Sequence, residues 1–145
     1  MTADERTATG RATLDALPSR EVAIAAARAA AQKQATDIVV LDVHELIVIT
    51  DYFVICSGAS AIQVRAIAEE IEDKLREEAG VKPIGREGQS QAAWILLDFG
   101  DLVVHVFQPA ERDFYRLENL WSDAPRLALP AGARGESAPA ANSSE

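Results

Sequence analysis

The fold is decided by Trp94-Ile-Leu-Leu-Asp-Phe-Gly-Asp-Leu-Val-Val-His-Val-Phe107, which contains two hydrophobic segments separated by Gly100-Asp101. A two-residue loop that begins with glycine is typical of a tight β-hairpin. Such a turn fixes which residues lie opposite each other, and paired residues point to the same side of the sheet. One side of this hairpin then carries only Ile, Leu, Phe and Val side chains. We expect that side to face the core.

The other side of the hairpin is chemically mixed, with the following residues on it: Trp94, Leu96, Asp98, Val103, His105 and Phe107. Burying one tryptophan removes about 150–250 Å² from water. At about 25 cal/mol per Å² this is worth about 4–6 kcal/mol as an upper bound, so the side should be covered. Either a helix of the same chain or another protein could cover this side. The mixture of aromatic and polar groups is more typical of an interface than of a core, which favours an exposed docking surface.

Before the hairpin, the sequence predicts two helices and two strands, namely helix 20–34, strands 38–41 and 52–56, and helix 60–79. Ser19 is suited to cap the first helix. In the second, Ser60 and Gln63 have capping-box spacing, hydrophobic residues recur with the period of a helix, and Gly80 provides the stop. The shape of the connection 45–50 stays open, either strand or packed loop.

Between helix 60–79 and the hairpin, residues 81–84 are compatible with a short edge strand, because Pro83 is excluded from a central position. Residues 85–91 read as a polar loop. After the hairpin, Pro109 opens a last helix of about 110–121 with an apolar stripe formed by Phe114, Leu117, Leu120 and Trp121. The sequence therefore predicts an α/β domain with a mixed sheet of about five strands flanked by helices.

Length and composition set the organisation of the 145 residues. We expect one domain, residues 18–124, between a disordered tail of residues 1–17 and a disordered tail of residues 125–145 that is rich in Ala, Pro and Ser. No apolar stretch approaches the about 20 residues of a membrane span. The first eleven residues do not resemble a signal peptide, and the single cysteine excludes an internal disulfide. These features favour a cytoplasmic protein.

The net charge of −9 bears on the class of partner. An acidic surface repels phosphate backbones, which disfavours direct binding of DNA or RNA. A basic protein suits this charge better, although acidity also serves solubility alone.

Several motifs suggest enzyme chemistry, but each is incomplete. Asp98-Phe99-Gly100 matches the metal-binding motif of protein kinases, but no glycine-rich phosphate loop accompanies it. The side chains of Cys56, His44 and His105 could bind a soft metal ion, but their positions in the sequence are not clustered as in known metal sites. Residues 57–60 precede a helix and are compatible with phosphate binding. The paired carboxylates that a nucleotidyltransferase needs for its metals are missing from residues 81–84. We therefore expect no enzyme, no catalytic residue, no metal and no cofactor, with a nucleotide-using enzyme as the alternative.

Three blocks of the chain closely resemble the ribosomal silencing factor family, the Iojap-related group. The blocks are Thr50-Asp-Tyr-Phe-Val-Ile55, the hairpin stretch from Trp94 to Phe107, and Arg112-Asp-Phe-Tyr-Arg-Leu-Glu-Asn-Leu-Trp121. The resemblance covers about residues 20–123, and the three blocks occur in the order found in the family. One departure is Ala93, where the family often has aspartate, and it puts one polar contact in doubt.

The resemblance implies a nucleotidyltransferase-like fold without that fold's chemistry. It also implies binding to large-subunit ribosomal protein fourteen on the intersubunit face of the large ribosomal subunit. The bound factor would sterically block the small subunit and repress translation, and the free protein would be a homodimer. We expect partner contacts at Trp94, Leu96, Asp98, His105, Phe107, Arg112 and Tyr115. Tyr115 and Trp121 are equally compatible with packing of the last helix, and a surface used only for self-assembly is a further alternative.

Overall fold

The structure, a computed structural model, describes residues 17–135. Its centre is a five-stranded sheet in the order β3-β4-β7-β6-β5. The strands are β3 (Thr36–Asp42), β4 (Tyr52–Ser57), β5 (Gly85–Glu87), β6 (Trp94–Asp98) and β7 (Leu102–Phe107). β4 and β7 run parallel, and the other neighbours are antiparallel. The predicted α/β class with a mixed five-stranded sheet is confirmed, whereas the nucleotidyltransferase-like designation stays a prediction.

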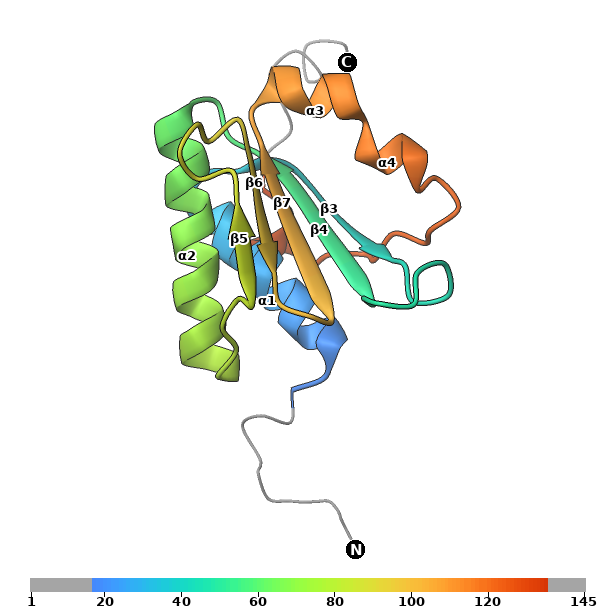
Figure 1. The fold of residues 1–145 in the computed structure, drawn as a ribbon. Helices are drawn as coiled ribbons and strands as arrows, with labels where there is room; N and C mark the ends of the chain where they lie inside the picture. Colours follow the sequence, from blue (N-terminus) through green and yellow to red (C-terminus); the bar gives the residue numbers. More distant parts are fainter. Residues whose placement is uncertain (1–16, 136–145) are drawn as a thin grey trace, which may run out of the picture.

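Two long helices, α1 (Ser19–Gln32) and α2 (Ala61–Ala79), pack against one face of the sheet, which we call the helix-covered face (Figure 1). Most of the buried residues of α1 are alanines, and their small side chains allow the helix to approach the strands closely. α2 buries Val64, Ile67, Ile71 and Leu75 at helical spacing. Neither helix, nor any other among residues 17–135, is both long and apolar enough to cross a membrane.

The hairpin register is the predicted one. Ile95 lies opposite Val106 and Leu97 opposite Val104 on the helix-covered face, while Trp94 lies opposite Phe107 on the other face. The N–H of Phe99 donates to the carbonyl of Leu102 over 2.8 Å, which closes the two-residue turn.

The start of α2 confirms the predicted cap at Ser60, whose Oγ accepts the N–H of Gln63 over 3.1 Å. The Gln63 side chain then makes three further contacts. Its Oε1 accepts the N–H of Ala59, and its Nε2 donates to the carbonyls of Lys33 and Gln34 just after α1. One glutamine therefore joins the end of α1 to the beginning of α2. Gly80, with φ 68°, ends the helix as predicted.

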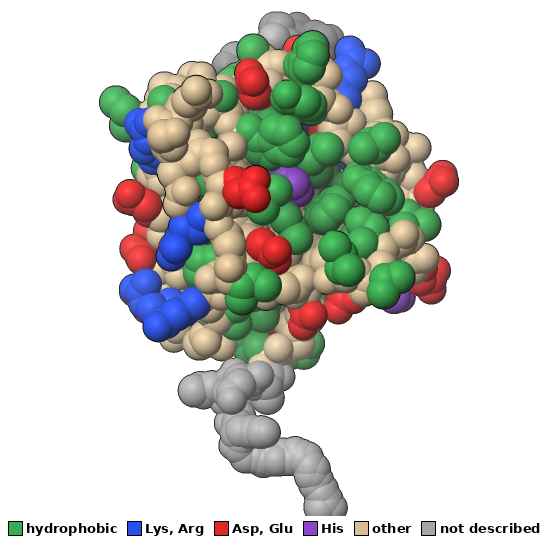
Figure 2. Space-filling model, in the orientation of Figure 1, with side chains coloured by type: hydrophobic (Ala, Val, Ile, Leu, Met, Phe, Trp, Pro, Cys, Tyr) green, Lys and Arg blue, Asp and Glu red, His purple; other side chains and the backbone are tan. Residues whose placement is uncertain are grey.

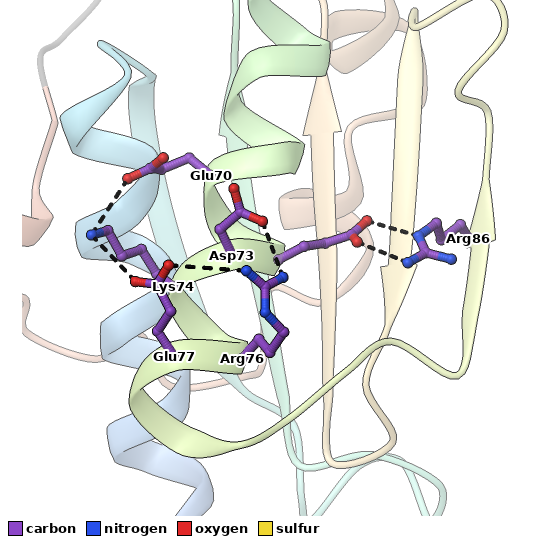
Figure 3. Close-up of polar contacts among 7 residues, drawn as sticks. Glu70, Asp73, Lys74, Arg76, Glu77 and Arg86 are labelled. Carbon is purple, nitrogen blue, oxygen red and sulfur yellow. Dashed lines mark hydrogen bonds and ion pairs between the residues drawn. The ribbon is translucent and has the colours of Figure 1, made fainter.

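The edge strand lies at Gly85–Glu87 rather than at residues 81–84, so the predicted position was wrong. An ion pair fixes it there, because Nε and Nη2 of Arg86 donate to the two carboxylate oxygens of Glu72 on α2 over 2.9 Å each (Figure 3). Farther along α2, Lys74 lies between Glu70 and Glu77, and Arg76 pairs with Asp73 (Figure 3). Much of the acidic face of this helix is therefore paired within the chain.

Two helix boundaries differ from the prediction. Pro18 occupies the N-cap position of α1, and the Ser19 hydroxyl instead donates to Asp101 Oδ2 at the hairpin turn over 3.2 Å. The last helix is split into α3 (Pro109–Tyr115) and α4 (Leu117–Leu120), because Arg116 takes a left-handed conformation with φ 49°.

Part of the second predicted tail is ordered. Pro125 and Leu127 form backbone hydrogen bonds with Asp42 and Val40 along the outer edge of β3. Leu127 and Leu129 pack on the core, and the short 3₁₀ helix η2 (Ala131–Ala133) packs against α1. Residues 125–135 therefore belong with the folded unit, while residues 1–16 and 136–145 lie outside the described part.

Candidate docking face

The face of the sheet opposite α1 and α2, which we call the aromatic face, is formed by Phe53 on β4, Trp94 and Leu96 on β6, and His105 and Phe107 on β7. α3 and α4 lie along its border (Figure 1). Its buried centre is a small cluster that also includes Leu41, Val43, Ile55 and Ala124. None of the residues of α3 and α4 is fully buried, so these helices cover the face only in part.

Trp94 is half-buried at the middle of this aromatic network. Its ring stacks on Phe107 with centroids 4.9 Å apart, and Tyr115 of α3 contacts it at 4.7 Å. The indole N–H donates to Nδ1 of His105 over 3.1 Å. Trp94 is thus held in one orientation while part of its ring stays accessible, and its role as an anchor residue stays a prediction.

His105 and Phe107 do not lie on the surface, and for these two the prediction of an outward-facing ring was wrong. Phe107 is completely buried and His105 is 5% exposed. The reason is their position on β7, which lies between β4 and β6, so that the rings of Phe53 and Trp94 close over them. His105 and Phe107 therefore pack beneath these rings and do not form the surface of the aromatic face.

Leu96 and Asp98 are both partly exposed, as the alternating pattern of β6 requires. Asp98 also has an internal role, because its Oδ1 accepts the N–H of Gly100 over 2.8 Å and so stabilises the hairpin turn.

Arg112 acts as a brace inside the chain. Its Nε and Nη2 donate to Glu118 Oε2 over 3.0 and 2.7 Å, and its Nη1 donates to the hydroxyl of Ser57 over 2.8 Å. Although burial acts to raise the pKa of Glu118, the hydrogen bonds from Arg112 hold that pKa below its usual value. The brace ties α3 and α4 to the end of β4, which positions Tyr115 over Trp94.

Several hydrophobic side chains are exposed where the sequence pattern did not predict it. Phe114 and Leu120 were assigned to a packing stripe, yet they are 78% and 69% exposed. The connection between β3 and β4 exposes Leu46, Val48 and Ile49. Figure 2 shows hydrophobic side chains gathered on this side of the molecule, with acidic side chains next to them. Trp121, in contrast, packs edge-to-face on Phe53 with centroids 5.9 Å apart.

In the segment before α2, considered above for phosphate binding, two backbone donors are already engaged within the chain. The N–H of Gly58 donates to the Phe107 carbonyl, and that of Ala59 to Gln63 Oε1. Among residues 17–135, no group of three or more His, Cys, Asp or Glu side chains is placed to hold a metal ion. Burial raises the pKa of the Cys56 thiol to about 12, so it stays protonated.

The comparisons with known proteins agree with the resemblance. The family model "Ribosomal silencing factor during starvation" matches residues 16–145. The "Ribosomal silencing factor RsfS" of Bacillus subtilis is 48% identical over 107 residues, which cover 74% of this chain and 90% of that protein. The protein of the same name from Halalkalibacterium halodurans is 42% identical over 113 residues, covering 78% of this chain and 96% of that protein. A crystal structure of a protein from Chromobacterium violaceum is similar with a TM-score of 0.71 and 36% identity, covering 81% of this chain and 96% of that one.

Proposed function

The chain belongs to the ribosomal silencing factor family, and from this premise we propose that it represses translation by binding the large ribosomal subunit through its aromatic face. The contact on the subunit is large-subunit ribosomal protein fourteen, and the bound factor blocks association with the small subunit. The protein acts in the cytoplasm, where its ribosomes are, and it acts without catalysis. The observation that carries the proposal is Trp94, a partly exposed indole held in place by aromatic neighbours.

The chemistry of the face supports a protein contact. Binding energy at protein interfaces concentrates in a few rigid aromatic anchors, which lose little conformational freedom on binding. Trp94 and Tyr115 have these properties, and exposed hydrophobic side chains such as Phe114 surround them. The net charge of −9 favours a basic protein over the phosphate backbone of RNA.

The same face accounts for a homodimer of the free protein. Exposed side chains such as Val48, Ile49 and Phe114 leave apolar area in water, and pairing with a second copy removes it. A surface used in this way is not available to the ribosome at the same time. The dimer is therefore the stored form, and it dissociates on the large subunit.

The test is sedimentation of the protein with isolated large subunits. Trp94→Ala should weaken binding by about 2 kcal/mol or more, roughly thirtyfold, because it removes the central anchor. The matched control is Ile62→Ala, which removes an exposed hydrophobic side chain from α2 on the other side of the sheet and should leave binding unchanged.

Both variants should keep the circular dichroism spectrum of the wild type. A subunit-joining assay then checks the consequence, since the wild type should inhibit association and Trp94→Ala should not. Equal affinity of Trp94→Ala and wild type for the large subunit would refute the site.

A further inference from the structure

We propose that His105 is the positioning residue of the aromatic face, where its buried neutral imidazole accepts the indole N–H of Trp94 and sets the orientation in which that ring meets the partner. The proposal rests on the docking function above. His105 is 5% exposed, so in place of the direct partner contact expected from the sequence it has an indirect role through Trp94.

The hydrogen bond defines the state of the imidazole. Trp94 and His105 are diagonal neighbours on β6 and β7, and Nε1 of the indole lies 3.1 Å from Nδ1 of the imidazole. An indole nitrogen only donates, so Nδ1 must offer a lone pair. In the neutral ring the proton is then on Nε2. Burial lowers the pKa of His105 to about 4, so this acceptor is present throughout the physiological range.

The surroundings keep the imidazole fixed. The Phe53 ring stands edge-to-face to it with centroids 5.2 Å apart, and the Phe107 ring lies nearly parallel to it at 6.2 Å. Rotation of the imidazole would have to displace these rings. The acceptor for Trp94 therefore has a defined place between two aromatic rings, and it aligns the indole.

The imidazole is not explained by stability alone. Its Nε2 is buried and has no hydrogen-bond partner among the described residues. A buried polar group without a partner destabilises a fold relative to an apolar side chain of similar shape. Since Nε2 is closed off from solvent, a docked protein does not reach it either. What His105 contributes that a leucine would not is the lone pair that orients Trp94.

Two substitutions separate the acceptor from the shape of the ring. His105→Leu removes the acceptor, and His105→Asn keeps a side-chain oxygen near the position of Nδ1. Both are made in a Trp121→Phe background, so that Trp94 gives the single indole signal of the chain. We expect the indole N–H resonance to move and to exchange faster in His105→Leu and to return toward its original position in His105→Asn. Affinity for large subunits should fall about tenfold in His105→Leu, as expected for losing one hydrogen bond, and within about threefold in His105→Asn.

The outcomes are distinguishable. An unchanged indole signal in His105→Leu overturns the inference, and so does a moved signal with unchanged subunit affinity when Trp94→Ala still weakens binding. If Trp94→Ala itself has no effect, the docking function and the inference fall together. Imidazole nitrogen shifts of the unsubstituted protein provide a reading that needs no variant to fold. They should show a proton on Nε2 and none on Nδ1, and a protonated Nδ1 overturns the inference.

Discussion

The helix-covered face and the aromatic face of one sheet treat their hydrophobic side chains in different ways. Under α1 and α2, aliphatic residues such as Ile71, Leu75, Leu97 and Val104 are at most 1% exposed. On the aromatic face, Phe107 reaches the same burial, but Trp94 is half-buried and Phe114 projects into solvent. The strands are shared, so the difference comes from the covering elements. Two long helices close one face, and the short helices α3 and α4 leave the other partly open.

Under the proposed function, this difference separates stability from recognition. Complete burial of aliphatic side chains is the main source of folding free energy, and the helix-covered face provides it. The aromatic face gives up part of that burial and leaves the rings of Trp94, Phe114 and Tyr115 partly or largely accessible to solvent. Substitutions on the two faces should therefore affect different measurements, which can be checked from the largest expected effect on stability to the smallest.

The largest effect is expected for Ile71→Ala. This side chain is completely buried between α2 and the sheet, and its truncation should lower the free energy of unfolding by about 2–5 kcal/mol. Urea denaturation measures this change, with the exposed Ile62→Ala on the same helix as the control that should stay within about 0.5 kcal/mol. The folded fraction of Ile71→Ala should bind large subunits normally, and a selective loss of binding would show that the two faces are not independent.

Gly88→Ala should lower the free energy of unfolding by about 2–3 kcal/mol, and it should also affect the aromatic face. Gly88 has φ 88°, and an added Cβ would overlap with the carbonyl oxygen of Trp94. A matched variant is Gly100→Ala, which has a similar φ of 92° but open space around the added atom. Gly100→Ala should lower the free energy of unfolding only by the conformational cost of a positive φ, about 1–2 kcal/mol. Thermal unfolding compares the two, and only Gly88→Ala should also weaken subunit binding, because it displaces the backbone of Trp94.

Lowering the pH from 7 to 5 should lower the free energy of unfolding by up to about 2 kcal/mol, through His105 on the aromatic face. The pKa of His105 falls from the ordinary 6.5 to about 4 on folding, so the unfolded chain binds more protons in this window and stability decreases as pH falls. The control is His105→Leu, whose unfolding free energy should depend less on pH by that amount.

His44 contributes with the opposite sign in both proteins, because hydrogen bonding to Asp42 raises its pKa, and the comparison cancels it. Equal pH dependence of wild type and His105→Leu would contradict the buried neutral imidazole.

The smallest effect on stability is expected for Phe114→Ser, below about 0.5 kcal/mol, because this ring is 78% exposed. Affinity for the large subunit should nevertheless fall about fivefold, roughly 1 kcal/mol, because the ring borders Tyr115. Ile84→Ser is the matched control, since Ile84 is 76% exposed beside β5. A loss of affinity for Ile84→Ser equal to that for Phe114→Ser would mean that general surface hydrophobicity, and not the aromatic face, determines binding.

The sequence predicted those parts of the fold that depend on local geometry. The two-residue turn at Gly100-Asp101 determines the whole hairpin register, and Ser60 and Gly80 mark the ends of α2 by their capping chemistry. The composition of the aromatic face followed directly from that register.

What the sequence did not predict depends on tertiary contacts. The break between α3 and α4 occurs at Arg116, a residue type that carries no signal for a left-handed conformation. Burial of His105 depends on Phe53, which is distant in sequence and adjacent only in the sheet. Residues 125–127 attach through backbone hydrogen bonds, which leave no pattern in the side chains.

The attachment of residues 125–127 to β3 has a consequence for how the molecule meets others. A free outer strand is a template for intermolecular strand exchange, and here the carbonyl of Val40 and the N–H of Asp42 are already engaged. At this edge of the sheet the backbone is thereby closed to strand exchange, which disfavours open-ended polymerisation through β3. A chain shortened to residue 124 would lose this protection while keeping its complete hairpin.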